Sequence, residues 1–206
     1  MGKVLKILQY SLGQLQANCY FLIQDKECLI IDPADDASFI LEELQRKRLK
    51  LSGMLATHGH FDHVMAAGEI QLNLNVPLYI FKEDQFLIDR LPETAEHFLG
   101  YKPTIIQPKS IKNLMNDEFK ISDFKFKIIW TPGHTPGSCC YYIKEIGSII
   151  TGDTLFKQGI GNYSHTYSSK NDLLKSLQTL FQLPGETLVY PGHGETTILK
   201  DELVSV

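Results

Sequence analysis

Four short β-rich runs in this chain each lead into a histidine or an aspartate. They are Met54–Thr57 before His58, Phe126–Thr131 before Pro-Gly-His134, Ile149–Thr151 before Gly-Asp153, and Leu188–Tyr190 before Pro-Gly-His193. In three of them a glycine that permits a tight turn precedes the polar residue. Ligand-binding groups of open α/β sheets gather at the carboxyl ends of the strands. The pattern therefore predicts an α/β fold that brings these side chains to one edge.

The remaining sequence predicts strands and helices in alternation in both halves. Strands are expected over Val4–Tyr10, Ala17–Gln24, Cys28–Ile31, Gly53–Thr57, Leu78–Phe81, Phe124–Trp130, Ser138–Ile143, Ser148–Thr151 and Thr187–Tyr190. Helices are expected over Asp35–Arg48, Val64–Asn73, Lys82–Asp89 and Asn171–Phe181. Leu91–Asn116 is rich in proline and lacks a clean period, so it is predicted as loop with a short strand at Thr104–Gln107. No linker divides the sequence, and a single domain over residues 1–206 is expected.

Charge and hydropathy argue against two classes of partner. A net charge of −4 gives no electrostatic footprint for nucleic acid. No apolar run approaches the roughly 18 residues of a membrane helix, and the first ten residues are too short and interrupted for a signal-peptide core. The four cysteines form no CxxC pair and are expected to be buried thiols. We therefore expect a soluble, cytoplasmic protein with neither nucleic-acid nor membrane partners, and its oligomeric state stays open.

The stretch THGHFDH, residues 57–63, places three of the seven histidines and one aspartate in six consecutive positions. With His134, Asp153 and His193 it makes seven candidate metal ligands, whereas an open zinc-type site uses about three. The simplest division gives one ion His58, His60 and His134, and a second ion Asp62, His63 and His193. Asp153, which carries two oxygens, could bridge the ions. His97 and His165 lie outside the set and are interpreted as ordinary structural residues.

Such a donor set suggests hydrolytic chemistry. Two divalent ions roughly 3.5–4 Å apart share a water and bring its pKa down to near 7. Against two aspartates and a bridging hydroxide they leave about one positive charge, which suits an ester- or thioester-like carbonyl and its oxyanion. Asp62 could orient the hydroxide or relay its proton. Imidazole and carboxylate ligands suit Zn, Fe or Mn alike, and we expect two divalent ions per chain, with zinc the first choice.

The order HxHxDH, a single histidine, an aspartate and a final histidine resembles the metallo-β-lactamase superfamily. Aspartate rather than cysteine at position 153 is similar to the glyoxalase II branch, as are NCYFLI (18–23), IIDPADD (30–36), TPGHTPGS (131–138), TGDTLFKQGIG (151–161) and LPGETLVYPGHGETT (183–197). The resemblance implies a four-layer αβ/βα sandwich with a dinuclear metal site at one edge, bridged by Asp153. It also implies that Asp32 does not bind a metal ion itself but orients a residue that does. The substrate it implies is a small hydroxyacyl thioester such as S-lactoylglutathione.

The sequence departs from that branch in two places. It ends soon after PGHGETT, without the usual terminal Asn-Pro motif, so the resemblance is to the short type, which lacks the helical C-terminal domain that grips glutathione. The relatives carry a cation after GIG that helps hold an anionic substrate, whereas this chain has Asn162 followed by Tyr163. Lys157 could supply this positive charge instead, although its position in the sequence differs from that of the cation in the relatives. These three residues are the candidates for substrate contact.

Two other functions stay open. Persulfide dioxygenases keep HxHxDH but use one iron held by residues matching His58, His134 and Asp153, and the missing arginine after GIG counts against them. A non-catalytic metal-binding module typically lacks a ligand, whereas all seven are present here.

Overall fold

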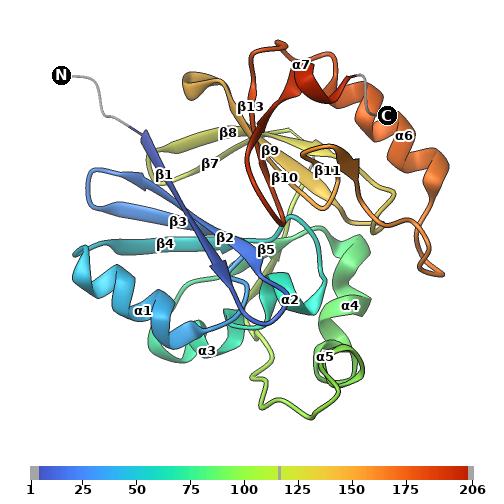
Figure 1. Ribbon diagram of the computed structural model, residues 1–206. Coiled ribbons are helices and arrows are strands. Elements are labelled where there is room, and N and C mark those ends of the chain that lie inside the picture. Colours follow the sequence, from blue (N-terminus) through green and yellow to red (C-terminus); the bar gives the residue numbers. More distant parts are fainter. Residues whose placement is uncertain (1–4, 116, 204–206) are drawn as a thin grey trace.

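The computed structural model describes residues 5–115 and 117–203, and shows two sheets that face one another with helices on their outer faces (Figure 1). Val4 and Asn116, which bound a predicted strand and a predicted loop, lie outside the described residues, as do both ends of the expected 1–206 range. None of the described helices is long and apolar enough to cross a membrane.

The first sheet comes from the first part of the chain and has the strand order β1-β2-β3-β4-β5-β6. Its strands are β1 (Leu5–Leu12), β2 (Ala17–Gln24), β3 (Glu27–Ile31), β4 (Lys50–Leu55), β5 (Leu78–Ile80) and β6 (Ile111–Asn113). β1, β2 and β3 pair antiparallel, and β3 to β6 pair parallel. Because β3 and β4 run in the same direction, the residues that follow them meet at one edge.

The second sheet has the order β14-β13-β10-β9-β8-β7. Its strands are β7 (Glu118–Ile121), β8 (Phe124–Trp130), β9 (Cys139–Ile143), β10 (Ser148–Gly152), β13 (Leu188–Pro191) and β14 (Thr197–Ile198), and a separate hairpin joins β11 (Leu155–Phe156) to β12 (Gly159–Ile160). β9 is antiparallel to both β8 and β10, and β13 is parallel to β10. The carboxyl ends of β8, β10 and β13 therefore share one edge.

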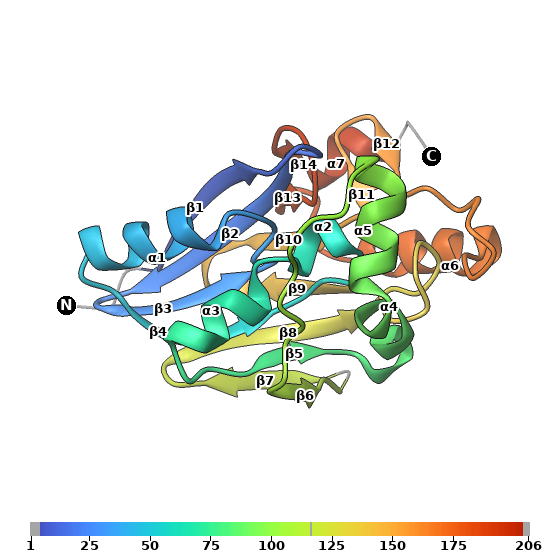
Figure 2. The same cartoon turned by 90° about the horizontal axis from the view of Figure 1, so that it is seen from below.

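Helices cover both outer faces of this pair of sheets (Figure 2). They are α1 (Ala37–Arg46), α2 (Phe61–Val64), α3 (Ala67–Asn73), α4 (Gln85–Asp89), α5 (Leu91–Leu99), α6 (Lys170–Leu180) and α7 (Leu199–Glu202), with 3-10 turns η1 (Lys82–Asp84) and η2 (Lys144–Ile146). α1 and α3 lie on the first sheet, and α6 lies on the second.

Alternation along the strands builds three buried cores. On β2, Phe21 joins the core beneath α1 and α3, whereas Tyr20 joins the core between the sheets. On β9, Tyr141 belongs to the core between the sheets and Cys140 to the core beneath α6. Successive side chains of a strand point to opposite faces, so each inner strand serves two cores. The predicted four-layer α/β fold is confirmed.

The prediction of loop over Leu91–Asn116, with a short strand at Thr104–Gln107, was wrong at its start, because Leu91–Leu99 forms α5. Pro92 lies in the first helical turn, where its missing N–H costs nothing, and Gly100 ends the helix in the left-handed conformation at φ 75°. The predicted strand Thr104–Gln107 is also absent, and the sixth strand is β6 instead. Just before it, the side chain of Gln71 bonds the backbone of Lys109 and Ser110.

Two predicted helices are also divided differently from the expectation. The helix predicted over Val64–Asn73 begins earlier, at Phe61, and is split into α2 and α3. The helix predicted over Lys82–Asp89 is the 3-10 turn η1 followed by α4. The first difference matters for the site, because it places His63 on a short helix rather than in a loop.

Candidate metal centre

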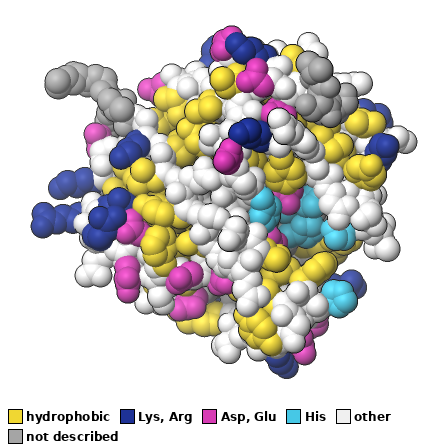
Figure 3. All heavy atoms as spheres, in the orientation of Figure 1, with side chains coloured by type: hydrophobic (Ala, Val, Ile, Leu, Met, Phe, Trp, Pro, Cys, Tyr) yellow, Lys and Arg dark blue, Asp and Glu magenta, His cyan; other side chains and the backbone are white. Residues whose placement is uncertain are grey.

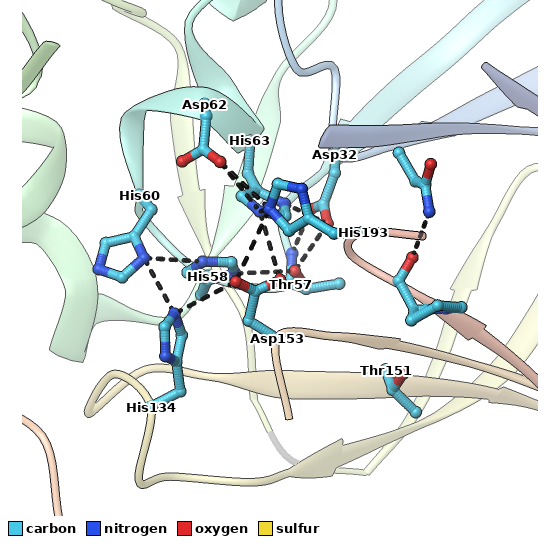
Figure 4. Close-up of polar contacts among 12 residues, drawn as sticks. Asp32, Thr57, His58, His60, Asp62, His63, His134, Thr151, Asp153 and His193 are labelled. Carbon is cyan, nitrogen blue, oxygen red and sulfur yellow. Dashed lines mark hydrogen bonds and ion pairs between the residues drawn. The ribbon is translucent and has the colours of Figure 1, made fainter. Parts of the chain in front are cut away.

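The seven predicted ligand residues converge at the edge where four strands end (Figure 4). His58 and His60 follow β4, Asp62 and His63 lie on α2, His134 follows β8, Asp153 follows β10 and His193 follows β13. Histidine side chains from this edge reach the surface on the face shown in Figure 3, with carboxylates and apolar side chains beside them. The strand ends therefore bring together residues that span 136 positions of sequence, from His58 to His193.

Three imidazoles form the first group. Nδ1 of His60 lies 3.1 Å from Nε2 of His58 and 3.0 Å from Nε2 of His134. Nδ1 of His58 donates to Thr57, whose hydroxyl proton goes to Asp32, and Nδ1 of His134 donates to a backbone carbonyl, so in the neutral rings both Nε2 atoms direct lone pairs at Nδ1 of His60. A cation among the three nitrogens removes that repulsion, because neutral imidazole nitrogens are metal ligands.

A carboxylate and two imidazoles form the second group. Oδ2 of Asp62 lies 3.3 Å from Nε2 of His193 and 3.6 Å from Nε2 of His63, and the two imidazole nitrogens are 3.3 Å apart. His58, His63 and Asp153 also bring ligand atoms within 4.8 Å of one another, which links the two groups.

Asp153 lies between the groups. Its Oδ1 is 3.5 Å from Nε2 of His63, and its Oδ2 is 3.5 Å from Nε2 of His134. Oδ1 is shielded from solvent and has no hydrogen-bond partner among the described residues. A buried carboxylate oxygen without a partner is costly, and a bound cation would satisfy it. The donor set therefore fits divalent metal, and the number of ions and the role of each residue as a ligand stay predictions.

Four of the histidines are oriented through the ring nitrogen that faces away from the cluster. Nδ1 of His58 lies 3.0 Å from Oγ1 of Thr57, and Nδ1 of His134 lies 2.7 Å from the carbonyl oxygen of Asn162. The other two contacts join Nδ1 of His63 to Oδ2 of Asp32 at 3.0 Å, and Nε2 of His60 to Oη of Tyr167 at 2.8 Å. Such contacts fix the tautomer and the direction of a metal-binding imidazole.

Asp32 lies fully buried behind the cluster at the end of β3, where the resemblance places a residue that orients a ligand. Its Oδ1 accepts the Thr57 N–H at 2.6 Å, and its Oδ2 accepts the Thr57 hydroxyl at 2.7 Å and faces His63. Thr57 in turn contacts His58. One carboxylate thus positions a residue of each ligand group.

The loop that carries His193 is bonded to β2 of the other sheet. Asn18 donates its backbone N–H to the Gly192 carbonyl at 2.7 Å, and Tyr20 donates its hydroxyl to the Pro191 carbonyl. A Cβ on Gly192 would overlap Oδ1 of Asp153 and lie 2.8 Å from Cε1 of His63. Only glycine therefore lets this backbone pass so close to the cluster.

Asp84 joins the two loops that carry His58 and His134. Its Oδ2 accepts the Gly59 N–H at 2.8 Å and the Thr135 hydroxyl at 2.7 Å, and its Oδ1 accepts the Gly137 N–H at 2.6 Å. The side chain is fully buried, and this burial raises the pKa of its carboxyl. The sequence predicted only a helical residue here, because no local pattern shows that Asp84 contacts both loops.

Burial and nearby carboxylates move histidine pKa values in opposite directions across the cluster. Burial, reinforced by neighbouring imidazoles, lowers the pKa of His58 well below its usual range. Burial also disfavours the charged form of His63, but Asp62, Asp153 and Asp32 outweigh it and raise the pKa to about 10. Burial and the neighbouring imidazoles thus disfavour the charged form of His58, whereas the three carboxylates favour the charged form of His63.

The predicted substrate contacts lie around the cluster with their side chains engaged elsewhere. Lys157 pairs with Glu195 at 2.6 Å on the surface. The Asn162 side chain accepts hydrogen bonds from Ser164, and only its backbone carbonyl reaches the site. Tyr163 is 41% exposed, and Lys170 lies over its ring. Substrate contact by these three residues stays a prediction.

Two residues further along the same loop are closer to the cluster than the sequence suggested. Tyr167 contacts His60 directly, and the His165 ring lies 5.4 Å from the His60 ring and 6.1 Å from the His134 ring. His165 had no expected role, yet the structure places it at the cluster. Its sequence neighbourhood, in the loop that departs from the glyoxalase II pattern, was the one available signal.

Similarity to known proteins extends over nearly the whole chain. The chain is 36% identical over 203 residues to the probable metallo-hydrolase YqgX of Bacillus subtilis, covering 96% of this chain and 95% of that protein. It is 33% identical over 190 residues to the hydroxyacylglutathione hydrolase GloC of Haemophilus influenzae, covering 91% and 90%.

Solved structures agree with this similarity. The BLEG-1 B3 metallo-beta-lactamase superposes with a TM-score of 0.89 at 32% identity, covering 97% of each chain. TTHA1623 in a di-iron-bound form gives the same TM-score at 31% identity, covering 96% of this chain and 98% of the other. The sequence profile of the metallo-beta-lactamase superfamily matches residues 12–193. With this match and these relatives, the chain belongs to the metallo-beta-lactamase superfamily, a family of metal-dependent hydrolases.

Proposed function

We propose that this protein hydrolyses small hydroxyacyl thioesters, such as S-lactoylglutathione, with two divalent metal ions held at the cluster. The observation that carries the proposal is the position of Asp153, whose two oxygens face different ligand groups. Its buried Oδ1 lacks a hydrogen-bond partner among the described residues. One carboxylate shared in this way suits a pair of ions, which is the arrangement of many two-metal hydrolases.

The chain's own residues have separable tasks in this proposal. His58, His60 and His134 would hold one ion, Asp62, His63 and His193 the other, and Asp153 would contact both. When bound, the ions would acidify a water and polarise the substrate carbonyl. Asp62 lies at the cluster with Oδ2 3.3 Å from His193, where it can orient a water or accept its proton. A thiolate is a good leaving group, so the reaction needs no dedicated general acid.

The thioester substrate is supported by similarity rather than by contacts. GloC of Haemophilus influenzae, 33% identical, is named a hydroxyacylglutathione hydrolase. The solved structure of BLEG-1, 32% identical, is titled a B3 metallo-beta-lactamase. The aspartate at 153 is one of the features by which the sequence resembles the glyoxalase II branch, and it favours the thioester over the β-lactam. Zinc remains our first choice of ion, and the di-iron form of TTHA1623 makes iron the second.

The test combines metal analysis with a rate measurement on one preparation. We expect two ions per chain and hydrolysis of S-lactoylglutathione, with nitrocefin as the β-lactam comparison. Asp153→Ala should lower both metal content and kcat/KM, the latter by at least about 100-fold. Asp201→Ala, at an exposed aspartate of α7, is the matched control and should behave as wild type.

Two results would contradict the proposal. Fully loaded protein with no thioester hydrolysis above the Asp153→Ala variant would exclude this substrate class. One iron per chain, together with oxygen consumption in the presence of a persulfide, would instead favour the dioxygenase alternative.

A further inference from the structure

The ring nitrogens of His60 have two different neighbours. Nδ1 faces the cluster, 3.1 Å from Nε2 of His58 and 3.0 Å from Nε2 of His134. Nε2 faces away and lies 2.8 Å from Oη of Tyr167. If Nδ1 binds an ion through its lone pair, the single proton of the neutral ring is on Nε2. The His60 N–H then donates to the Tyr167 oxygen, and this bond selects the metal-binding tautomer.

Tyr167 is itself held in place by packing. Its ring stacks on His165, with centroids 5.3 Å apart and planes 12° apart, and meets the edge of Phe86 from α4 at 5.3 Å. The following residues bind the loop of His134, since the Ser168 hydroxyl donates to the His134 carbonyl and the Ser169 N–H donates to Gly133. The hydroxyl is therefore presented to His60 by a constrained segment.

His60 differs from the other histidines in where its partner comes from. His58 is oriented by the adjacent residue Thr57, and His63 by the fully buried Asp32. His134 is oriented by a backbone carbonyl, which no substitution removes. The partner of His60 is a side chain 107 residues away, on a partly exposed loop. Among these four contacts it is the one in which a ligand depends on a side chain of a surface loop, because the same loop reaches His134 only through the backbone carbonyl of Asn162.

We propose that Tyr167 is a positioning residue for His60, so that the segment 162–169 controls the affinity of the ion held by His58, His60 and His134. The inference rests on the metal centre of the proposed function and is independent of which substrate that centre hydrolyses. Loss of the Tyr167 hydroxyl weakens the binding of this ion and leaves the binding of the second ion unchanged. The reason is that the hydroxyl is bonded to His60 and not to Asp62, His63 or His193.

The test is a metal titration of Tyr167→Phe, which removes the hydroxyl and keeps the ring against His165 and Phe86. Zn²⁺ or Co²⁺ is titrated into metal-free protein against a chromophoric chelator, and the two binding steps are fitted separately. We expect one step to weaken by about 10–100-fold, the usual effect of losing a partner of a metal ligand, and the other to stay unchanged. A thermal melt of the metal-free variant should match that of wild type.

Two further proteins make the result specific. Tyr101→Phe, at an exposed tyrosine outside the 162–169 segment, should bind both ions as wild type does. Introducing Tyr167→Phe into His60→Ala should cause no additional loss, because the hydroxyl acts through a ring that is already gone.

The outcomes separate this inference from the proposed function. If wild type binds two ions and Tyr167→Phe binds each of them as tightly as wild type does, the role of Tyr167 is overturned and the proposed function is not affected. Equal weakening of both steps, or a further loss in the His60→Ala background, would also overturn it. Wild type that binds no ion would overturn both proposals. Two bound ions without thioester hydrolysis would remove only the proposed substrate, since the titration uses no substrate.

Discussion

The two halves of the chain contribute to the cluster in opposite ways. The first half contributes His58, His60, Asp62 and His63 from six consecutive positions, on one loop and the short helix α2. The second half contributes three residues from three separate loops, after β8, β10 and β13. The first set is placed by local backbone, and the second by strand register and by the close packing of loops. The second half should therefore be the more sensitive to changes at residues that are not ligands.

The largest effect we expect comes from Gly192→Ala, which alters this packing without removing a ligand. The added Cβ would overlap Asp153 and crowd His63, so the bridging carboxylate must move. Displacing a reacting group by about 1 Å can cost about 100-fold in rate, and we expect a loss of at least that size in kcat/KM together with reduced metal content. Metal analysis and steady-state kinetics measure both.

Gly159→Ala is the control for that experiment, because an added Cβ there meets nothing nearer than Phe156 Cβ at 4.0 Å. It should keep full metal content and rate. Wild-type behaviour of Gly192→Ala would show that the second half accommodates changes as readily as the first.

An intermediate effect is expected at Asp84, which joins the halves by bonding the loops of His58 and His134. Asp84→Asn replaces one acceptor oxygen with an amide that faces N–H and O–H donors. Because each unsatisfied buried donor costs about 1–3 kcal/mol, we expect the free energy of unfolding to fall by that amount. Urea unfolding of the metal-free protein measures it. Asp89→Asn, at an exposed position of α4, should stay within about 0.5 kcal/mol of wild type; an equal loss in both variants would remove the special role of Asp84.

The smallest effect concerns the first half alone, where Glu43 of α1 is bonded by Arg46 and by the Tyr10 hydroxyl of β1. These hydrogen bonds, with Arg46 the larger cause, lower the pKa of Glu43 from 4.5 to about 2. The folded state therefore gains stability from ionised Glu43 above pH 4.5 and loses that gain as the pH falls toward 2.

We expect Glu43→Gln to lower Tm by roughly 2–4 °C near neutral pH, which corresponds to about 1 kcal/mol. The difference from wild type should shrink steadily below pH 4.5. Melts at several pH values check this, and a difference that persists unchanged into acid would show that the charge of Glu43 is not involved.

Much of the fold could be predicted because strand periodicity and strand ends are local signals. β-rich runs located β2 and β9, alternation helped to locate β8, and the polar residues after β4, β8, β10 and β13 indicated which side chains would meet. Helix α5 was missed because proline was interpreted as a breaker, although Pro92 lies in the one turn where it is tolerated.

The parts of the site that escaped prediction depend on contacts between distant segments. Asp84 bonds loops 25 and 53 residues away, and Tyr167 reaches His60 across 107. Neither residue carries a pattern of its own, since an aspartate in a helical turn and a tyrosine in a polar loop are common. Only the packing of η1 and of the 162–169 segment around the cluster distinguishes them.

The burial of the four cysteines has a practical consequence for measuring activity. All four thiols are free and buried, and burial raises the pKa of each. A reagent that detects thiols reacts with accessible thiolate, which these side chains do not offer in the folded protein. The thiol released from a thioester can therefore be followed continuously on native enzyme, and any slow signal from the protein itself would report unfolding rather than turnover.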